Sequence, residues 1–261
     1  MKFSLNSGCE PQYLEKADEI KVAWKDRKII PELVEKYPDK VLNLCFYPSQ
    51  IEEPIDWKEI EDYNNLTRNK LLCTVNNINN CIECKRRNIK FCYGYAVDNF
   101  YELQALKKLG VSYVRLGIAL FFQMDRVNKI GVPIRVIPNI AYLDAMPRED
   151  GVCGQWIRPE DLDLYEEYVD IIEFEDVNVK KEQGLYRTYS IECGWPGDLN
   201  DLITNLNFKA ANYMLPKSLS YVRLNCGQKC QINGSCEACY RAFRLANPEL
   251  IKQYAEDNSL T

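Results

Sequence analysis

Short strand-like runs alternate with amphipathic helical patterns over the first two thirds of this chain. Each run is rich in β-branched or aromatic residues and is followed by a turn. Eight strands are predicted, at Lys2–Ser7, Ile20–Trp24, Val41–Tyr47, Leu71–Asn77, Lys90–Val97, Tyr113–Ala119, Ile134–Ala141 and Ile171–Glu175.

The helical patterns between these runs are clearest at Asn99–Leu109, where apolar residues recur every three residues and Gly110 ends the segment. Further helices are predicted at Lys28–Lys36, Asp56–Arg68, Phe121–Ile130 and Pro159–Val169. Strict alternation indicates parallel strands joined by right-handed crossovers. Eight such units predict an α/β fold, a compact (β/α)8 TIM-like barrel over residues 1–176.

The alternative architecture is an open, doubly wound sheet. Its phosphate loop normally reads G-x-G-x-x-G after the first strand, and here that turn reads NSGCEP. Past residue 176 the alternation stops, apart from a helix expected at Leu199–Leu206. We expect residues 177–261 to form a C-terminal cap on the barrel.

A dense cysteine cluster lies in this predicted cap. Cys226, Cys230, Cys236 and Cys239 follow the spacing C-x3-C-x5-C-x2-C, which lets four thiolates converge on one centre. Tetrahedral sulfur ligation suits zinc or an iron-sulfur cluster, and the spacing does not separate the two. Free buried cysteines and a disulfide pair are the alternatives.

A second cysteine set has the spacing C-x7-C-x2-C-x7-C. Cys73 and Cys92 fall inside predicted strands, which favours packing. Cys81 and Cys84 lie in the connection between those strands, where they could complete a site with other cysteines.

Histidine is absent from all 261 residues. This excludes Ser-His-Asp and Cys-His catalysis and histidine-ligated zinc hydrolysis, so acid-base work falls to Asp, Glu, Lys, Tyr or Cys. A net charge of −5 provides no footprint for tight, nonspecific binding to nucleic acid, and no DNA partner is expected. The apolar runs are too short to span a bilayer and the first residues do not resemble a leader, so we expect a cytoplasmic protein with no membrane partner.

In a barrel of this kind, the reactive face lies at the carboxyl ends of the strands. Glu173 and Glu175 share one face of the last strand, Arg115 could clamp an anion, and Asn139 could bind a polar ligand. Trp156 and Arg158, in the stretch between the last two strands, could stack on and pair with a planar or anionic ligand. A loop anchored by a buried tryptophan is the alternative for that stretch.

The stretches IRPEDLDLYEEYVDIIEFED (Ile157–Asp176), YRTY (Tyr186–Tyr189) and NGSCEACYRAF (Asn233–Phe243) resemble motifs of the collagenase-like peptidase family. The resemblance implies a barrel with a four-cysteine site, related to proteins that hydroxylate RNA bases or quinone precursors with an iron-sulfur cluster. It carries over Glu173 and the four clustered cysteines, although here the cysteine segment follows the P-x-D-L unit that it precedes in the family. The family's histidine-containing segment has no counterpart, so the resemblance does not imply protease activity.

These observations lead to one main hypothesis and two alternatives. The main hypothesis is a barrel enzyme with an iron-sulfur cluster or zinc that modifies RNA or a small aromatic substrate, with Glu173 as the catalytic residue. The first alternative is a non-catalytic binding or scaffold protein in which zinc holds the cap in place. The second is a barrel lyase or isomerase that uses a Glu or Lys base.

Overall fold

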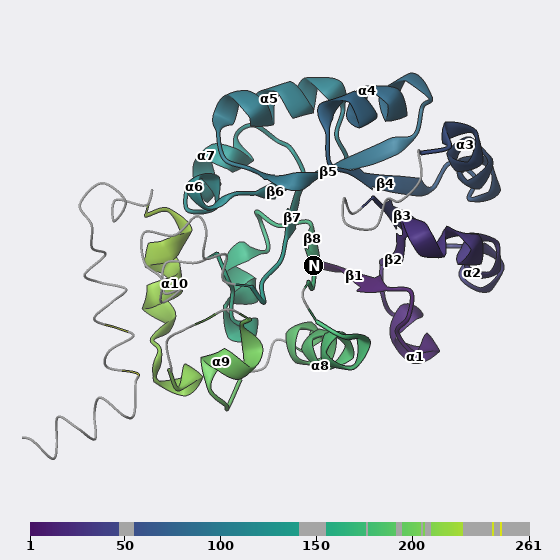
Figure 1. The fold of residues 1–261 in the computed structure, drawn as a ribbon. Helices are drawn as coiled ribbons and strands as arrows, with labels where there is room; N and C mark the ends of the chain where they lie inside the picture. Colours follow the sequence, from purple (N-terminus) through teal and green to yellow (C-terminus); the bar gives the residue numbers. More distant parts are fainter. Residues whose placement is uncertain are drawn as a thin grey trace, which may run out of the picture.

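The computed structural model describes residues 1–46, 55–140, 155–175, 177–191, 195–204, 206, 210–226, 242 and 246. Eight parallel strands form a closed barrel in the order β1 to β8, and β8 pairs with β1 through Phe3 and Ile172. Helices surround the strands, and the N-terminus lies close to the barrel wall (Figure 1). The (β/α)8 prediction is confirmed, and the open sheet is wrong because the first and last strands are hydrogen-bonded to each other.

Every predicted strand is present, and most of them end earlier than predicted. The strands are β1 (Lys2–Asn6), β2 (Glu19–Ala23), β3 (Val41–Cys45), β4 (Leu71–Val75), β5 (Lys90–Val97), β6 (Tyr113–Leu116), β7 (Ile134–Val136) and β8 (Ile171–Glu173). β6 stops where Gly117 becomes the N-cap of the next helix. β7 stops just ahead of Pro138, whose ring removes a backbone donor.

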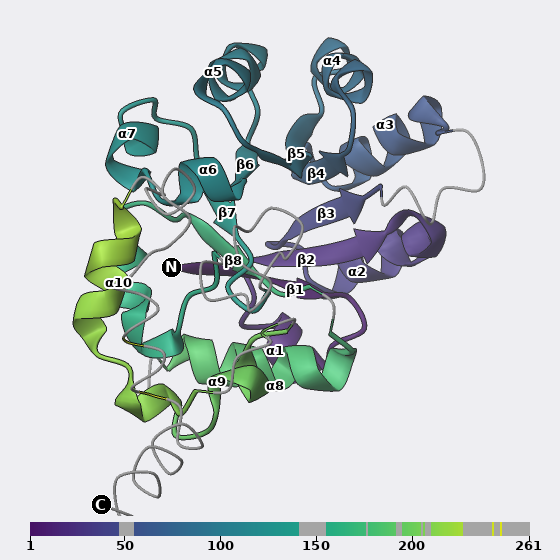
Figure 2. The same cartoon turned by 60° about the vertical axis from the view of Figure 1, so that its left-hand side comes forward.

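Helices cover the outside of the barrel (Figures 1 and 2). They are α1 (Pro11–Leu14), the 3₁₀ helix η1 (Trp24–Ile29), α2 (Ile30–Lys36), α3 (Trp57–Leu66), α4 (Ile78–Arg86), α5 (Phe100–Leu109), α6 (Ile118–Phe121), α7 (Met124–Asn128), the 3₁₀ helix η4 (Pro159–Tyr165) and α8 (Val179–Ser190). Among the described residues, no helix has the length and apolar character that crossing a bilayer would require.

The helix ends follow local side-chain chemistry. The side chains of Asp56, Asn77, Asn99 and Asn178 accept hydrogen bonds from the first-turn N–H groups of α3, α4, α5 and α8. Gly110 ends α5 with a φ of 87°, a backbone conformation that disfavours residues with a Cβ. The position predicted to end α5 is therefore confirmed.

The outward faces of the strands carry the hydrophobic core. Leu5, Ile20, Val22, Leu44 and Val114 alternate with inward residues, and each is fully buried beneath the helices. Cys73 belongs to the same shell, and α4 brings Cys81 and Cys84 over it. Contact with Cys84, together with burial, raises the pKa of the Cys73 thiol, so this thiol is a neutral packing group. The sequence analysis did not predict α4 and placed these two cysteines in a connecting loop.

The first helix after β8 still belongs to the barrel, and the elements that follow this helix do not. α8 packs against β1 and η4 and buries Leu185, Tyr186 and Tyr189, in the position of the eighth barrel helix. The last β/α unit thus ends at Ser190, later than the predicted boundary at residue 176. The chain then forms α9 (Leu199–Leu202), the 3₁₀ helix η5 (Asn212–Met214) and α10 (Lys217–Leu224). α10 lies on the opposite side of the molecule from α2 and α3 (Figures 1 and 2).

Candidate active site inside the barrel

Many inward positions of the strands are polar, although branched apolar residues usually fill a barrel of this type. The inward positions include serine, threonine, asparagine and several charged residues, all strongly shielded from solvent. They are Ser4, Glu19, Lys21, Asn43, Thr74, Arg115, Arg135 and Glu173. Charged groups so far from water are favourable only when they are paired, and the pairs described below form one continuous network.

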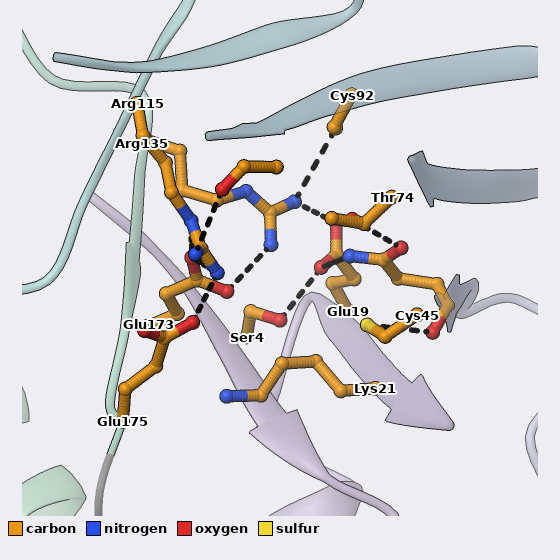
Figure 3. A network of polar contacts seen from close by, with 12 residues as sticks. Ser4, Glu19, Lys21, Cys45, Thr74, Cys92, Arg115, Arg135, Glu173 and Glu175 are labelled. Atoms are coloured by element: carbon orange, nitrogen blue, oxygen red, sulfur yellow. Dashed lines mark hydrogen bonds and ion pairs between the residues drawn. The ribbon is translucent and has the colours of Figure 1, made fainter. Parts of the chain in front are cut away.

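Glu19 is the anchor of this network on β2. Its carboxylate accepts hydrogen bonds from Ser4 Oγ at 2.6 Å, Asn43 Nδ2 at 2.8 Å and Arg135 Nη2 at 2.7 Å. Asn43 in turn accepts a hydrogen bond from Thr74 Oγ1 at 2.9 Å. Side chains from β1, β3 and β7 thus meet at the Glu19 carboxylate on β2, and β4 joins the network through Asn43 (Figure 3).

Arg135 joins Glu19 to Glu173 across the lumen. Its second nitrogen, Nη1, lies 2.9 Å from Glu173 Oε2, and the side chain is only 2% exposed. Burial alone would lower the pKa of Arg135, but the charges of Glu19 and Glu173 raise it well above its ordinary value. This guanidinium is a permanent positive charge in the barrel interior.

Glu173 is held ionised by the cations around it. Arg115 Nε lies 2.7 Å from Glu173 Oε1, and the carboxyl is 1% exposed. Burial alone would raise the pKa of Glu173, yet the charges of Arg115, Arg135 and Lys21 lower it to about 2. Glu173 therefore holds Arg115 and Arg135 in place, and its role as the catalytic residue stays a prediction.

Arg115 leads from the buried network toward the mouth of the barrel at the carboxyl ends of the strands. It forms an ion pair with Glu175, which is 20% exposed, and it donates to the carbonyl of Gly94 at 3.2 Å. That carbonyl lies in a bulge of β5, between Tyr93 and Ala96. A Cβ at Gly94 would collide with the Asn76 side chain, so only glycine fits beside Arg115 in this arrangement.

Lys21 lies beside the same group of carboxylates. Its Nζ donates to the carbonyl of Phe174 at 2.9 Å and is 3.5 Å from Glu182 Oε1. Burial alone would lower the pKa of Lys21, but Glu173, Glu182 and Glu175 together raise it above its ordinary value. Lys21 is therefore an ammonium at neutral pH, suited to stabilising negative charge rather than to acting as an amine nucleophile.

The charges of the whole network nearly balance. Three cations, Lys21, Arg115 and Arg135, face four carboxylates, those of Glu19, Glu173, Glu175 and Glu182. Among these seven described side chains, one net negative charge remains.

Four of the six residues predicted at this face, Arg115, Asn139, Glu173 and Glu175, are close together. Arg115 and Glu173 form the ion pair described above, and Asn139 lies next to Glu175. The Asn139 amide donates to the Glu175 carbonyl at 2.9 Å and accepts from its N–H at 3.3 Å. Asn139 is fully buried, so it fixes the backbone beneath Glu175 rather than facing a ligand directly.

Trp156 and Arg158 lie in the wall beside the C-terminal segment. Trp156 is fully buried, with the guanidinium of Arg223 3.8 Å from its ring centre. Arg158 forms a bidentate pair with Asp161, at 2.5 and 3.0 Å, and donates to the carbonyl of Leu215. These contacts attach the segment after α8 to η4. They match the alternative prediction, a loop anchored by a buried tryptophan. They give no support to the prediction that either side chain contacts a ligand.

The predicted metal cluster lies almost wholly outside the described residues. Cys226 follows α10 and is partly buried against the hydrophobic core, while Cys230, Cys236 and Cys239 are beyond the described part. Within the described part of the chain, no three Cys, Asp or Glu residues are grouped so that they could hold a metal ion. A zinc or iron-sulfur site at the four cysteines remains a prediction.

Sequence reasoning missed Glu19, Lys21 and Glu182. The signal for the first two was present, because Glu19 and Lys21 alternate on β2 as Glu173 and Glu175 do at the end of β8. The predicted strand began at Ile20 and so left Glu19 out. Glu182 belongs to α8, which was not predicted, and only the packing of α8 against β1 brings it to Lys21.

Comparison with known proteins does not assign this chain to a family. No protein-family model matches the chain, and no curated protein does. Among solved structures, 3-keto-L-gulonate-6-phosphate decarboxylase from Vibrio cholerae is similar with a TM-score of 0.46 at 12% identity, over 74% of this chain and 95% of that one. A native KDPGal structure has a TM-score of 0.45 at 10% identity, over 73% and 92% of the two chains. KGPDC from Streptococcus mutans has a TM-score of 0.44 at 12% identity, over 73% and 95%.

Proposed function

We propose that this protein is a barrel enzyme of the lyase or isomerase type, which moves a proton at a carbon atom next to a carbonyl group. One observation carries the proposal: an ion pair of Arg115 and the partly exposed Glu175 lies at the mouth, beside the cationic Lys21, and is fixed from below by buried Glu173. A carboxylate next to fixed positive charges is the arrangement that proton abstraction and enolate stabilisation require.

The solvent exposure of the side chains indicates which residue is the candidate base. Glu175 is the candidate base because its side chain is 20% exposed, whereas Glu173 is 1% exposed and has a pKa of about 2. The C–H bond breaks, the proton goes to Glu175, and the electron pair moves to the carbonyl oxygen. Lys21 and Arg115 then stabilise the negative charge that develops on that oxygen.

The charge of the site favours one class of substrate. The described charges of the network sum to one net negative charge, which we expect to disfavour a phosphate or carboxylate on the substrate. We therefore expect a small, neutral, polar carbonyl compound, such as an unphosphorylated ketose or aldose.

Solvent exchange tests the proposal without knowledge of the full reaction. The protein is incubated in D2O with a panel of neutral ketoses and aldoses and their phosphate esters, and the loss of the C–H signal beside the carbonyl is followed by proton NMR. We expect exchange with a neutral member. Glu175→Gln should slow it by a factor on the order of 10²–10⁴, the usual contribution of a positioned acid or base.

A matched variant controls for the loss of a carboxylate as such. Glu166 is exposed at the end of η4, outside the network, and Glu166→Gln should leave the exchange rate unchanged. An unchanged rate in Glu175→Gln, or exchange of phosphate esters in preference to neutral compounds, would contradict the proposal.

The modification of RNA or of an aromatic compound with an iron-sulfur cluster remains a separate hypothesis. Its support is the spacing of the four cysteines and the family resemblance, together with the placement of Cys226 at the end of α10 against the hydrophobic core. Iron, sulfide and zinc analysis of anaerobically purified protein tests it. Stoichiometric zinc without iron would favour a structural role for the cluster.

A further inference from the structure

The amino ends of the strands border a cavity, at the opposite end of the barrel from the candidate active site. Its volume is about 410 Å³, within the range of small-molecule sites. It is lined by residues at or next to the starts of the strands: Lys2, Asp18, Glu19, Val41, Lys70, Leu72, Lys90, Ser112, Tyr113, Pro133, Asp170 and Ile171.

Three lysines surround this cavity because of the strand period. Lys2, Lys70 and Lys90 each precede an inward-facing residue by two positions, namely Ser4, Leu72 and Cys92. Alternation therefore places all three lysines on the lumen side of their strands. This pattern gathers positive charge at the opening.

The acidic residues of the cavity already have hydrogen-bond donors. Asp18 accepts from the N–H of Phe3 at 2.9 Å, and Asp170 accepts from the N–H of Ile134 at 2.8 Å. Glu19 is occupied by the three donors described above, including Arg135. Of the three lysines, Lys70 is already paired with the exposed Asp39 at 3.8 Å, whereas Lys2 and Lys90 have no carboxylate partner within the described part of the chain.

The walls of the cavity are largely apolar. Val41, Leu72, Pro133 and Ile171 line it together with the ring of Tyr113. Burial raises the pKa of Tyr113 above its ordinary value, so its phenol remains protonated at neutral pH and can donate a hydrogen bond. An apolar chamber with cations at its opening fits an amphiphilic anion better than a bare ion.

We propose that this cavity binds a small organic anion, with its flat or aliphatic body among the apolar walls and its carboxylate or phosphate at Lys2, Lys70 and Lys90. The site lies at the opposite end of the barrel from Glu175, and the inference does not depend on the proposed reaction.

Calorimetric titration of the full chain with phenyl phosphate tests the proposal, with inorganic phosphate and phenol as the comparison ligands. Phenyl phosphate should bind saturably at one site, and each comparison ligand should bind at least about ten-fold more weakly because it offers only half of the recognised chemistry. Lys2→Ala/Lys70→Ala/Lys90→Ala should weaken phenyl phosphate binding by roughly ten-fold, as expected for three charges at a solvent-facing rim. Lys90→Ala alone should weaken it by roughly two-fold, which covers the case that the triple variant does not fold.

Two controls make the result specific. Lys25→Ala/Lys28→Ala/Lys58→Ala removes three exposed lysines outside the cavity and should bind as tightly as wild type. Glu175→Gln should also bind normally, which separates this site from the candidate active site. The proposal is overturned if wild type shows no saturable binding, if the cavity lysine variants bind as tightly as wild type, or if inorganic phosphate binds equally well, which would indicate an adventitious ion only.

Discussion

The outward and inward faces of the barrel strands differ in polarity and in what they contribute to the protein. The outward face packs leucine, isoleucine and valine beneath the helices, whereas the inward face holds a chain of ion pairs from Glu19 to Glu175. Apolar burial on the outside supplies most of the stability of such a shell, since it scales with the area removed from water. The outer shell can thus hold the barrel closed while the lumen carries charges that contribute little net stability but fix the geometry of the site.

The largest expected effect comes from breaking one buried pair in the lumen. Arg135→Met keeps the approximate volume but leaves Glu19 and Glu173 without their shared cation, and we expect a loss of about 3–5 kcal/mol in the free energy of unfolding. Urea denaturation measures it. Glu19→Gln/Arg135→Met removes one of the uncompensated charges and should be less destabilised than the single variant. Equal stability of wild type and Arg135→Met would show that the lumen charges are solvated.

Acid should destabilise the barrel through its inward face. The pKa of Glu173 is about 2 in the folded protein, below its ordinary value of 4.5, so the unfolded chain binds the proton more readily between these values. The stabilisation by this group is full above about pH 4.5 and is lost as the pH falls toward 2. It amounts to about 3 kcal/mol.

The measurement is the free energy of unfolding between pH 2 and pH 6, for wild type and for Glu173→Gln. The pH dependence of wild type should be steeper by about the same 3 kcal/mol over this range. Parallel curves for the two proteins would contradict a depressed pKa at Glu173.

The smallest expected effect lies on the outer shell. Asn99→Ala removes the N-cap of α5, where the side chain accepts from the N–H of Glu102 at 2.8 Å, and should cost about 1 kcal/mol. Because the cap is uncharged, the loss should be the same at pH 3 and pH 7. Thermal unfolding of wild type and Asn99→Ala at both pH values measures this loss. A strongly pH-dependent loss would contradict the difference between the two faces of the strands.

The alternation of strand-like and helical segments in the sequence was sufficient to predict the strands that form the wall of the barrel. Eight runs rich in β-branched or aromatic residues led to eight strands, and Gly110 ended α5 where its sequence position indicated. The local sequence pattern was also sufficient to predict that Arg115, Glu173 and Asn139 lie at the site, because each is near the carboxyl end of a strand.

The rest depended on contacts that no local pattern encodes. The partner of Lys21 is Glu182, 161 positions further along the chain, and the two meet only once α8 packs on β1. Trp156 and Arg158 have the composition of a ligand-binding loop, but the packing of the segment after α8 decides their role. The bulge of β5 at Gly94 had a weak signal, a glycine within a strand, which does not state what approaches it.

The ion pairs of the lumen also bear on the order of events in folding. Arg135 reaches Glu19 over 116 residues of chain, and Arg115 reaches Glu173 over 58, so neither pair can form before distant strands have come together. If these pairs form only after the strands have come together, their loss should raise the unfolding rate more than it lowers the folding rate. We therefore expect the charged lumen to bear mainly on how long the closed barrel lasts.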